Sequence, residues 1–478
     1  MLRVTPNMKN LHSIKLIILC FYIISCGGST HGENESIDSS IISKNPATDT
    51  FKTEQIFNPV ICNGDLQQSY ALYIPQNRTN EPLPVVYFFD PHGDGGLPLT
   101  KYKALADSFH FILIGSNNSK NGNDWNDAEN IWKTLSNDSQ KRIAINRNRI
   151  YTCGFSGGAK VATFIALNHA DIKGVIANGA GLPDILNAGN FNFSFTAIAG
   201  NGDMNMTDLV SINNSLNKTN TTHRIIFFDG IHEWAPESTM DKAFAGIQAD
   251  AMRQKLIPKN DSFINTIINK NKKEIEDDIK ANDFLKADGI CNFSISILSG
   301  LTDEVNWFKE KKNFFANNSV YQKQWLAEQK ILAEEENIKA SYQQKFGSED
   351  INYWGKTIND VKAKAAKKTP EAAMYQRLQA YLSLAFYSIS NQLITANENT
   401  QAQHFVTLYK MADSSNSEAW YFAAILAARN KDAKATKDEL LKAVSFGFND
   451  RKRMESQPEF KSQDMSIDLG EIESKMKK

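Results

Sequence analysis

The sequence has few cysteines. Five occur in 478 residues, and two of them, Cys20 and Cys26, lie close to the N-terminus. The other three, Cys62, Cys153 and Cys291, have no regular spacing, which argues against a disulfide framework. No group of His, Asp, Glu or Cys has the spacing of metal ligands either. We therefore expect no bound metal, no metal-dependent hydrolysis and no cofactor.

The sequence also lacks an excess of charge. Lys and Arg together number 53, Asp and Glu 54, so the net charge is close to zero. Nothing in this balance predicts a nucleic-acid partner held through phosphate contacts. Hydrophobic residues make up 41% and charged residues 22%, which predicts a packed core, and the length predicts two to four domains.

The apolar run near the N-terminus, LIILCFYIISCGGST, is too short to span a bilayer as a mature helix. Lys9 and Lys15 precede it, and Ser25 and Cys26 end it. This arrangement resembles the signal peptide and lipobox of bacterial lipoproteins; a plain signal peptide is the alternative. The resemblance implies that Cys26 is lipidated and becomes the new N-terminus, and that the protein is anchored in the bacterial envelope. Gly27 after the cysteine is compatible with the outer membrane. Residues 27–52 are polar and are expected to form a flexible tether.

Residues 53–258 alternate between apolar runs and helical stretches. YALYIP (70–75) predicts an edge strand, and later runs such as PVVYFFD and FILIGSN are continuously apolar, as strands covered on both faces are. Strands that alternate with helices indicate βαβ units. We therefore predict an α/β fold: a mostly parallel sheet with helices on both faces.

The text after Pro258 is mostly helical. Residues 259–370 are predicted to be a helical linker or domain. Residues 371–478 contain Ala-rich and aromatic helices that resemble the end of a tetratricopeptide-type array, although no clean 34-residue period is found. An ordinary helical bundle is the alternative. The resemblance implies that this all-α, repeat-like domain contacts a protein partner.

Gly154-Phe155-Ser156-Gly157-Gly158 fits the pattern G-x-S-x-G. In a nucleophile elbow, a serine stands on a strained turn from a strand into a helix, and small neighbours are needed for the chain to turn so tightly. The apolar run before Ser156 and the helical stretch after it supply that context. A turn that happens to be rich in small residues is the alternative.

A serine needs a base, and the base needs an orienting carboxylate. The order Ser156, Asp203, His232 places these groups after three predicted strands and resembles the α/β-hydrolase family. Residues 230–236, which include Trp234, resemble the histidine region of polyhydroxybutyrate depolymerase-like and feruloyl esterase-like enzymes. The resemblance implies that Ser156 is the nucleophile, His232 the base and Asp203 its partner. Asp229 is the rival carboxylate.

The oxyanion of the tetrahedral intermediate needs two backbone N–H donors. The resemblance assigns one to Gly157, and His92-Gly93 matches the family's HG pair, so the amide of Asp94 is the second expected donor. An acidic side chain at position 94 departs from the family pattern. His92 is expected to be structural. Trp234 is expected either to line the cleft or only to pack.

These features predict a serine hydrolase that cleaves carboxylic esters through an acyl-enzyme. Residues 182–192 are too few for a helical lid, so an open site for an ester attached to a polymer or polysaccharide is expected. A peptidase with the same triad, or a binding lipoprotein that uses the hydrolase fold as a scaffold, are the alternatives.

Overall fold

The computed structural model describes residues 51–76, 81–183, 189–461 and 468–476. Cys26, the predicted signal peptide and almost all of the predicted tether lie outside these residues. The chain divides into two compact units, and the boundary at Ile331 falls within helix α9 (Ser319–Lys345). No helix of the described residues is both long enough and apolar enough to cross a membrane.

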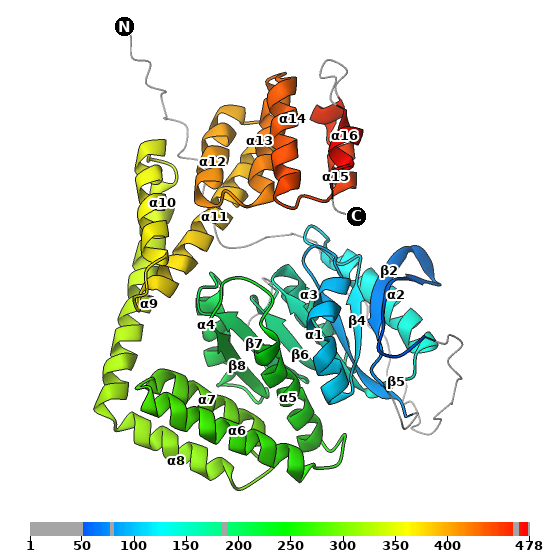
Figure 1. The fold of residues 1–478 in the computed structure, drawn as a ribbon, viewed down its shortest axis with the longest axis vertical. Coiled ribbons are helices and arrows are strands. Elements are labelled where there is room, and N and C mark those ends of the chain that lie inside the picture. Colours follow the sequence, from blue (N-terminus) through cyan, green and yellow to red (C-terminus); the bar gives the residue numbers. More distant parts are fainter. Residues whose placement is uncertain (1–50, 77–80, 184–188, 462–467, 477–478) are drawn as a thin grey trace, which may run out of the picture. The chain divides into compact units, whose positions relative to one another are not determined.

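The first unit is built on one mixed sheet (Figure 1). Its strand order is β1-β2-β4-β3-β5-β6-β7-β8, with β2 antiparallel to both β1 and β4 and all other pairs parallel. This confirms the predicted α/β class. The strands are β1 (Ile56–Cys62), β2 (Asp65–Tyr73), β3 (Leu83–Phe89), β4 (Ile112–Ser116), β5 (Ile145–Phe155), β6 (Ile172–Asn178), β7 (Ser194–Gly200) and β8 (His223–Phe228).

The predicted position of one strand in the sheet is wrong. The segment predicted as an edge strand at 70–75 belongs to β2, which starts earlier and is not at the edge, because β1 pairs outside it. β1 contains Pro59, which has no N–H for a ladder, and proline in a sheet is found mainly on edge strands. Pro59 therefore weakens the strand signal of β1 in the sequence, and it is compatible with the edge position of β1 in the sheet.

Helices cover both faces of the sheet. Successive strand side chains point to opposite faces. Phe88 of β3 stacks on Tyr102 of α1, while the adjacent Tyr87 packs edge-on against Trp132 of α2. α1 also packs on α5, and α2 on α3. The helices of this part are α1 (Gly96–Phe109), α2 (Trp125–Arg142), α3 (Gly157–Asn168), α4 (Met206–Leu216) and α5 (Glu237–Arg253).

The compact unit extends past residue 258, where the sequence predicted the end of the domain. Helix α7 (Phe284–Leu298) packs on β8 and α5, and one apolar core continues from the sheet into α6 (Asp261–Lys280), α7 and α8 (Val305–Ala316). The predicted helical segment 259–370 is therefore divided between the two units. Periodicity alone could not assign α6 to α8 to the sheet. It predicts that a helix has an apolar face, but it does not predict which part of the protein that face packs against.

The second unit is helical, and the helices from α10 (Ile351–Ala365) to α14 (Ala433–Ser445) each pack on the next (Figure 1). Its core has its own aromatic cluster, in which Trp354 stacks on Phe346 and Tyr421 stacks on Phe448. Whether it is a true repeat array stays a prediction. Its helices after α9 are α10 (Ile351–Ala365), α11 (Ala372–Thr395), α12 (Asn399–Ala412), α13 (Ser417–Arg429), α14 (Ala433–Ser445), α15 (Arg451–Ser456) and α16 (Leu469–Glu473).

Candidate active site

Ser156 stands at the turn between β5 and α3, in the conformation that the motif requires. Its backbone has φ 53° and ψ −123°, a region that residues with a side chain rarely adopt. Its N–H donates to the carbonyl oxygen of Asn178 at 2.9 Å, which fixes the turn to the adjacent strand β6. Strand β5 therefore ends in a sharp, strained turn that carries the hydroxyl.

The glycines around Ser156 are required by close backbone approach. A Cβ atom on Gly154 would lie 2.0 Å from the carbonyl oxygen of Gly158. A Cβ atom on Gly158 would lie 2.0 Å from the carbonyl oxygen of Phe89, at the end of β3. Both obstacles are backbone atoms, which cannot move aside as a side chain can. The small residues are thus needed for the first turn of α3 to approach two strands.

The structure brings Ser156, His232 and Asp203 together in one hydrogen-bonded line. Nε2 of His232 lies 2.9 Å from Oγ of Ser156, and Nδ1 lies 2.9 Å from Oδ1 of Asp203. A carboxylate only accepts, so the proton of the neutral imidazole belongs on Nδ1 and Nε2 is left to accept from the hydroxyl. The rival carboxylate, Asp229, instead accepts from the side-chain amide of Asn201 at 2.7 Å.

Asp203 is fully buried, while the side chain of His232 is 20% exposed. Oδ1 of Asp203 also accepts from the backbone N–H of Asn205 at 2.9 Å, and Oδ2 has no hydrogen-bond partner within the described part of the chain. Gly179 makes room for the pair: with φ +69°, its Cβ would lie 3.1 Å from Oδ2 of Asp203 and 3.2 Å from Cε1 of His232. The imidazole is thus exposed on one side and held by a buried carboxylate on the other.

The loop that carries His232 is held by contacts with residues at the ends of β5 and β6. Trp234 is buried, so it packs rather than lines a cleft, and its ring lies against Phe155 with centroids 5.6 Å apart. The side chain of Asn178 accepts from the N–H of Ala235 at 2.7 Å and donates to the carbonyl of Glu233 at 3.2 Å. One buried amide at the end of β6 therefore holds the main chain on both sides of Trp234.

In the predicted oxyanion loop, residues 90–96, the side chain of Asp94 points toward helix α1. Oδ1 of Asp94 accepts from the N–H groups of Gly96 and Leu97, each at 3.1 Å, at the start of that helix. This use of the carboxylate explains an acidic residue at position 94. The side chain of His92 is 81% exposed, and Gly93 has φ +75°, a conformation that favours glycine.

Sequence reasoning did not find three residues of this site. Asn178 is the last residue of β6, and Asp90 follows the last residue of β3. A polar residue at the carboxyl end of a parallel strand could have marked both as candidates. Asn121 gave no signal: it lies in the loop after β4, its N–H donates to the carbonyl of Pro91 at 2.8 Å, and its Oδ1 lies 2.0 Å from where a Cβ of Gly157 would be. Its carboxamide therefore contacts the residue that follows the serine.

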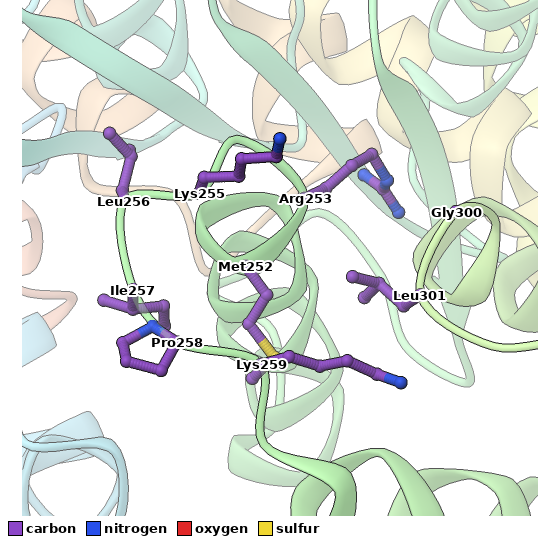
Figure 2. A pocket seen from close by; sticks show the side chains of 9 residues that line it. All are labelled: Met252, Arg253, Lys255, Leu256, Ile257, Pro258, Lys259, Gly300 and Leu301. Atoms are coloured by element: carbon purple, nitrogen blue, oxygen red, sulfur yellow. The ribbon is translucent and has the colours of Figure 1, made fainter.

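Two other features bear on ligands. A surface hollow of about 550 Å³ is lined by the end of α5 and the turn after it, including Met252, Leu256 and Pro258, and by Leu301 (Figure 2). It contains none of the three hydrogen-bonded residues. Within the described residues, no group of three or more His, Cys, Asp or Glu side chains could hold a metal ion.

Comparison with known families and curated proteins gives no match. Among solved structures, the chain is similar to a fluorophosphonate-binding serine hydrolase of Staphylococcus aureus, with 12% identity and a TM-score of 0.32 over 38% of this chain and 92% of that one. An esterase of Pyrobaculum calidifontis matches with 11% identity and a TM-score of 0.35 over 42% and 87%. A ferulic acid esterase matches with 14% identity and a TM-score of 0.29 over 37% and 88%. At this level of similarity, the chemistry of this chain has to be inferred from its own residues.

Proposed function

We propose that this protein is a serine hydrolase that cleaves carboxylic esters through an acyl-enzyme. The observation that carries the proposal is the continuous line from the Ser156 hydroxyl through the His232 imidazole to the buried Asp203 carboxylate. A hydroxyl is a weak nucleophile until a base removes its proton, and this line supplies the base and the group that orients it.

The reaction follows from these contacts. Nε2 of His232 takes the proton of Oγ while Oγ attacks the ester carbonyl, and the carboxylate of Asp203 stabilises the imidazolium that forms. The N–H of Gly157, at the start of α3, donates to the oxyanion. His232 then protonates the leaving alcohol, and water, deprotonated by His232 in turn, releases the acid from Ser156.

The strain at Ser156 supports an enzyme over a binding scaffold. A φ of 53° at a residue with a side chain costs free energy, and such strain persists where the surrounding structure enforces it for a purpose. A scaffold gains nothing from holding a serine in this conformation with a histidine 2.9 Å from its hydroxyl.

The proposal is tested by covalent labelling. The intact protein should react with a fluorophosphonate probe and hydrolyse p-nitrophenyl acetate, and Ser156→Ala should do neither. Ser211→Ala, on an exposed position of α4, is the matched control and should behave as the wild type. Asp203→Asn should keep the fold and lower kcat by about 10⁴-fold, because an amide favours the wrong tautomer of His232. Labelling of Ser156→Ala as fast as the wild type would contradict the proposal.

We also propose that the protein is anchored through lipid on Cys26, acts on esters attached to a polymer or polysaccharide, and contacts a protein through its helical unit. The lipobox-like sequence around Cys26 supports the anchor, and the repeat-like sequence of residues 371–478 supports the protein contact. The segment 182–192, which is too short for a helical lid, supports an ester carried on a polymer. Cys26→Ser should move the protein from the membrane fraction to the soluble fraction of expressing cells. Unchanged membrane association would remove the lipid anchor from the proposal.

A further inference from the structure

Asp90 joins two loops of the site that are far apart in the sequence. It follows the last residue of β3, and it is only 3% exposed. Its Oδ1 accepts from the backbone N–H of His92 at 2.8 Å, within its own loop. Its Oδ2 accepts from the indole N–H of Trp234 at 2.8 Å, in the loop that carries His232. The two oxygens of one carboxylate thus serve two different loops.

We propose that Asp90 is a positioning residue of this hydrolase, whose carboxylate holds the loop after β3 and the histidine loop after β8 in one fixed arrangement. It acts on the reaction through Trp234 and not by touching the substrate. The inference rests on the function proposed above.

Trp234 transmits this constraint to His232. Phe155 contacts both residues, with ring centroids 4.7 Å from His232 and 5.6 Å from Trp234. Asn178 fixes the main chain on either side of Trp234. The indole therefore cannot rotate or shift without displacing the ring that packs against the imidazole. The hydrogen bond to Asp90 sets where the indole lies.

The carboxylate is suited to this task because both of its oxygens only accept. Burial alone would raise the pKa of Asp90, but the hydrogen bonds from His92 and Trp234 outweigh burial and leave the pKa below its ordinary value. The group is therefore ionised at neutral pH. The imidazole of His92, with Nδ1 3.4 Å from Oδ1, is largely exposed, and solvent screens its contribution.

A carboxamide of the same shape cannot replace this group. Asparagine has one oxygen to accept and one NH₂ that only donates, so it can satisfy either the His92 N–H or the Trp234 N–H, but not both. In Asp90→Asn, the N–H of His92 and the N–H of Trp234 therefore compete for one oxygen. Trp234→Phe removes one of these two donors and keeps an aromatic ring.

The test is a double-mutant cycle on the intact chain, with kcat and KM for p-nitrophenyl acetate and the rate of fluorophosphonate labelling as readouts. Asp90→Asn should lower kcat by about 10- to 100-fold with KM changed less than about 2-fold, since small misplacements of a catalytic group cost rate. Trp234→Phe should lower kcat less. The double variant should be no slower than Asp90→Asn alone, because the one oxygen of the amide then serves His92.

Asp138→Asn is the matched control. Asp138 is another buried carboxylate. It accepts from the hydroxyl of Tyr70 at 2.9 Å, from the N–H of Asn63 at 2.8 Å and from Nη1 of Arg142 at 2.9 Å, none of which belongs to the site loops. It should lower the urea midpoint of unfolding and leave kcat within about 2-fold of the wild type. If it lowers kcat as much as Asp90→Asn does, the effect is general destabilisation and the proposal fails.

Two outcomes overturn the role of Asp90 alone: wild-type kcat in Asp90→Asn, or losses that multiply in the double variant. If Asp90→Asn does not fold, Trp234→Phe decides, because it removes the indole N–H and keeps an aromatic ring at this position: a kcat and labelling rate equal to those of the wild type overturn the proposal. Failure of the proposed function is distinguishable, since the wild type itself would then not be labelled.

Discussion

Replacing Ser156 by glycine should give a more stable protein than replacing it by alanine. At φ 53° and ψ −123°, a Cβ atom is strained, and a residue held in such a region costs about 1 to 3 kcal/mol. Alanine keeps the Cβ and the strain. Glycine removes both, because it adopts positive φ about as readily as negative φ.

The magnitude follows from the terms that differ between the two variants. Both lose the hydrogen bond between Oγ and His232, worth about 1 kcal/mol, so that loss cancels in the comparison. Glycine also loses more conformational entropy on folding than alanine does, about 0.5 to 1 kcal/mol. The released strain exceeds this cost, and Ser156→Gly should therefore be more stable than Ser156→Ala by about 1 kcal/mol.

Urea unfolding of the intact chain, followed by tryptophan fluorescence, measures this difference. The control pair is Ser211→Gly and Ser211→Ala, at an exposed position inside helix α4, where glycine should be the less stable by about 1 kcal/mol. The prediction is thus a reversal of sign between two serine positions. If glycine is the less stable at both, Ser156 is not in a strained conformation and the elbow interpretation is refuted.

Gly158→Ala should destabilise the protein by at least about 2 kcal/mol in urea unfolding, because its Cβ would lie 2.0 Å from a backbone carbonyl oxygen. Gly289→Ala, in a helix with open space around it, should instead stabilise by about 1 kcal/mol; equal effects would contradict this reading. Burial raises the pKa of Cys62 and of Cys291 to about 12, so both thiols stay neutral at pH 8, and mass spectrometry should find them unlabelled by iodoacetamide until the chain unfolds. Asp250→Asn should lower the free energy of unfolding by about 3 to 5 kcal/mol, because it leaves the buried guanidinium of Arg224 without its carboxylate. If calorimetry finds the free energy of unfolding lowered by less than about 1 kcal/mol, this reasoning is wrong.

The inner parallel strands, such as β3, β6 and β7, could be predicted because both of their faces are covered. In β3, every residue but Leu83 is buried, so the sequence reads as a continuous apolar run. Ser156, Asp203 and His232 were singled out by the resemblance to the α/β-hydrolase order, and a second rule, that the carboxyl ends of parallel strands meet at one edge of the sheet, predicted that they lie close together. Three residues far apart in the sequence could be brought together without knowing a single contact.

The antiparallel edge and the extent of the unit could not be predicted in the same way. The first four residues of β1 are exposed or half-buried without alternation, and Pro59 is one of them, so the sequence gives only a weak strand signal there. Helices α6 to α8 carry an apolar face that would equally suit a separate bundle. Only the packing of α7 on β8 and α5 assigns them to the sheet.

The parts of the site that sequence reasoning missed have a common cause. The meeting of the strand ends that carry Ser156, Asp203 and His232 follows from topology. The groups that hold these residues follow from pairings between loops, such as the hydrogen bond from Trp234 to Asp90 across 144 residues. A topology rule predicts which strand ends meet, but it does not predict which side chain there donates to which. Small misplacements of a catalytic group cost rate, so these loop contacts matter to the proposed reaction although they touch none of the reacting atoms. An Asp directly after an apolar strand, in a chain with a Trp two residues after the predicted base, is the pattern to search for in other sequences with this motif.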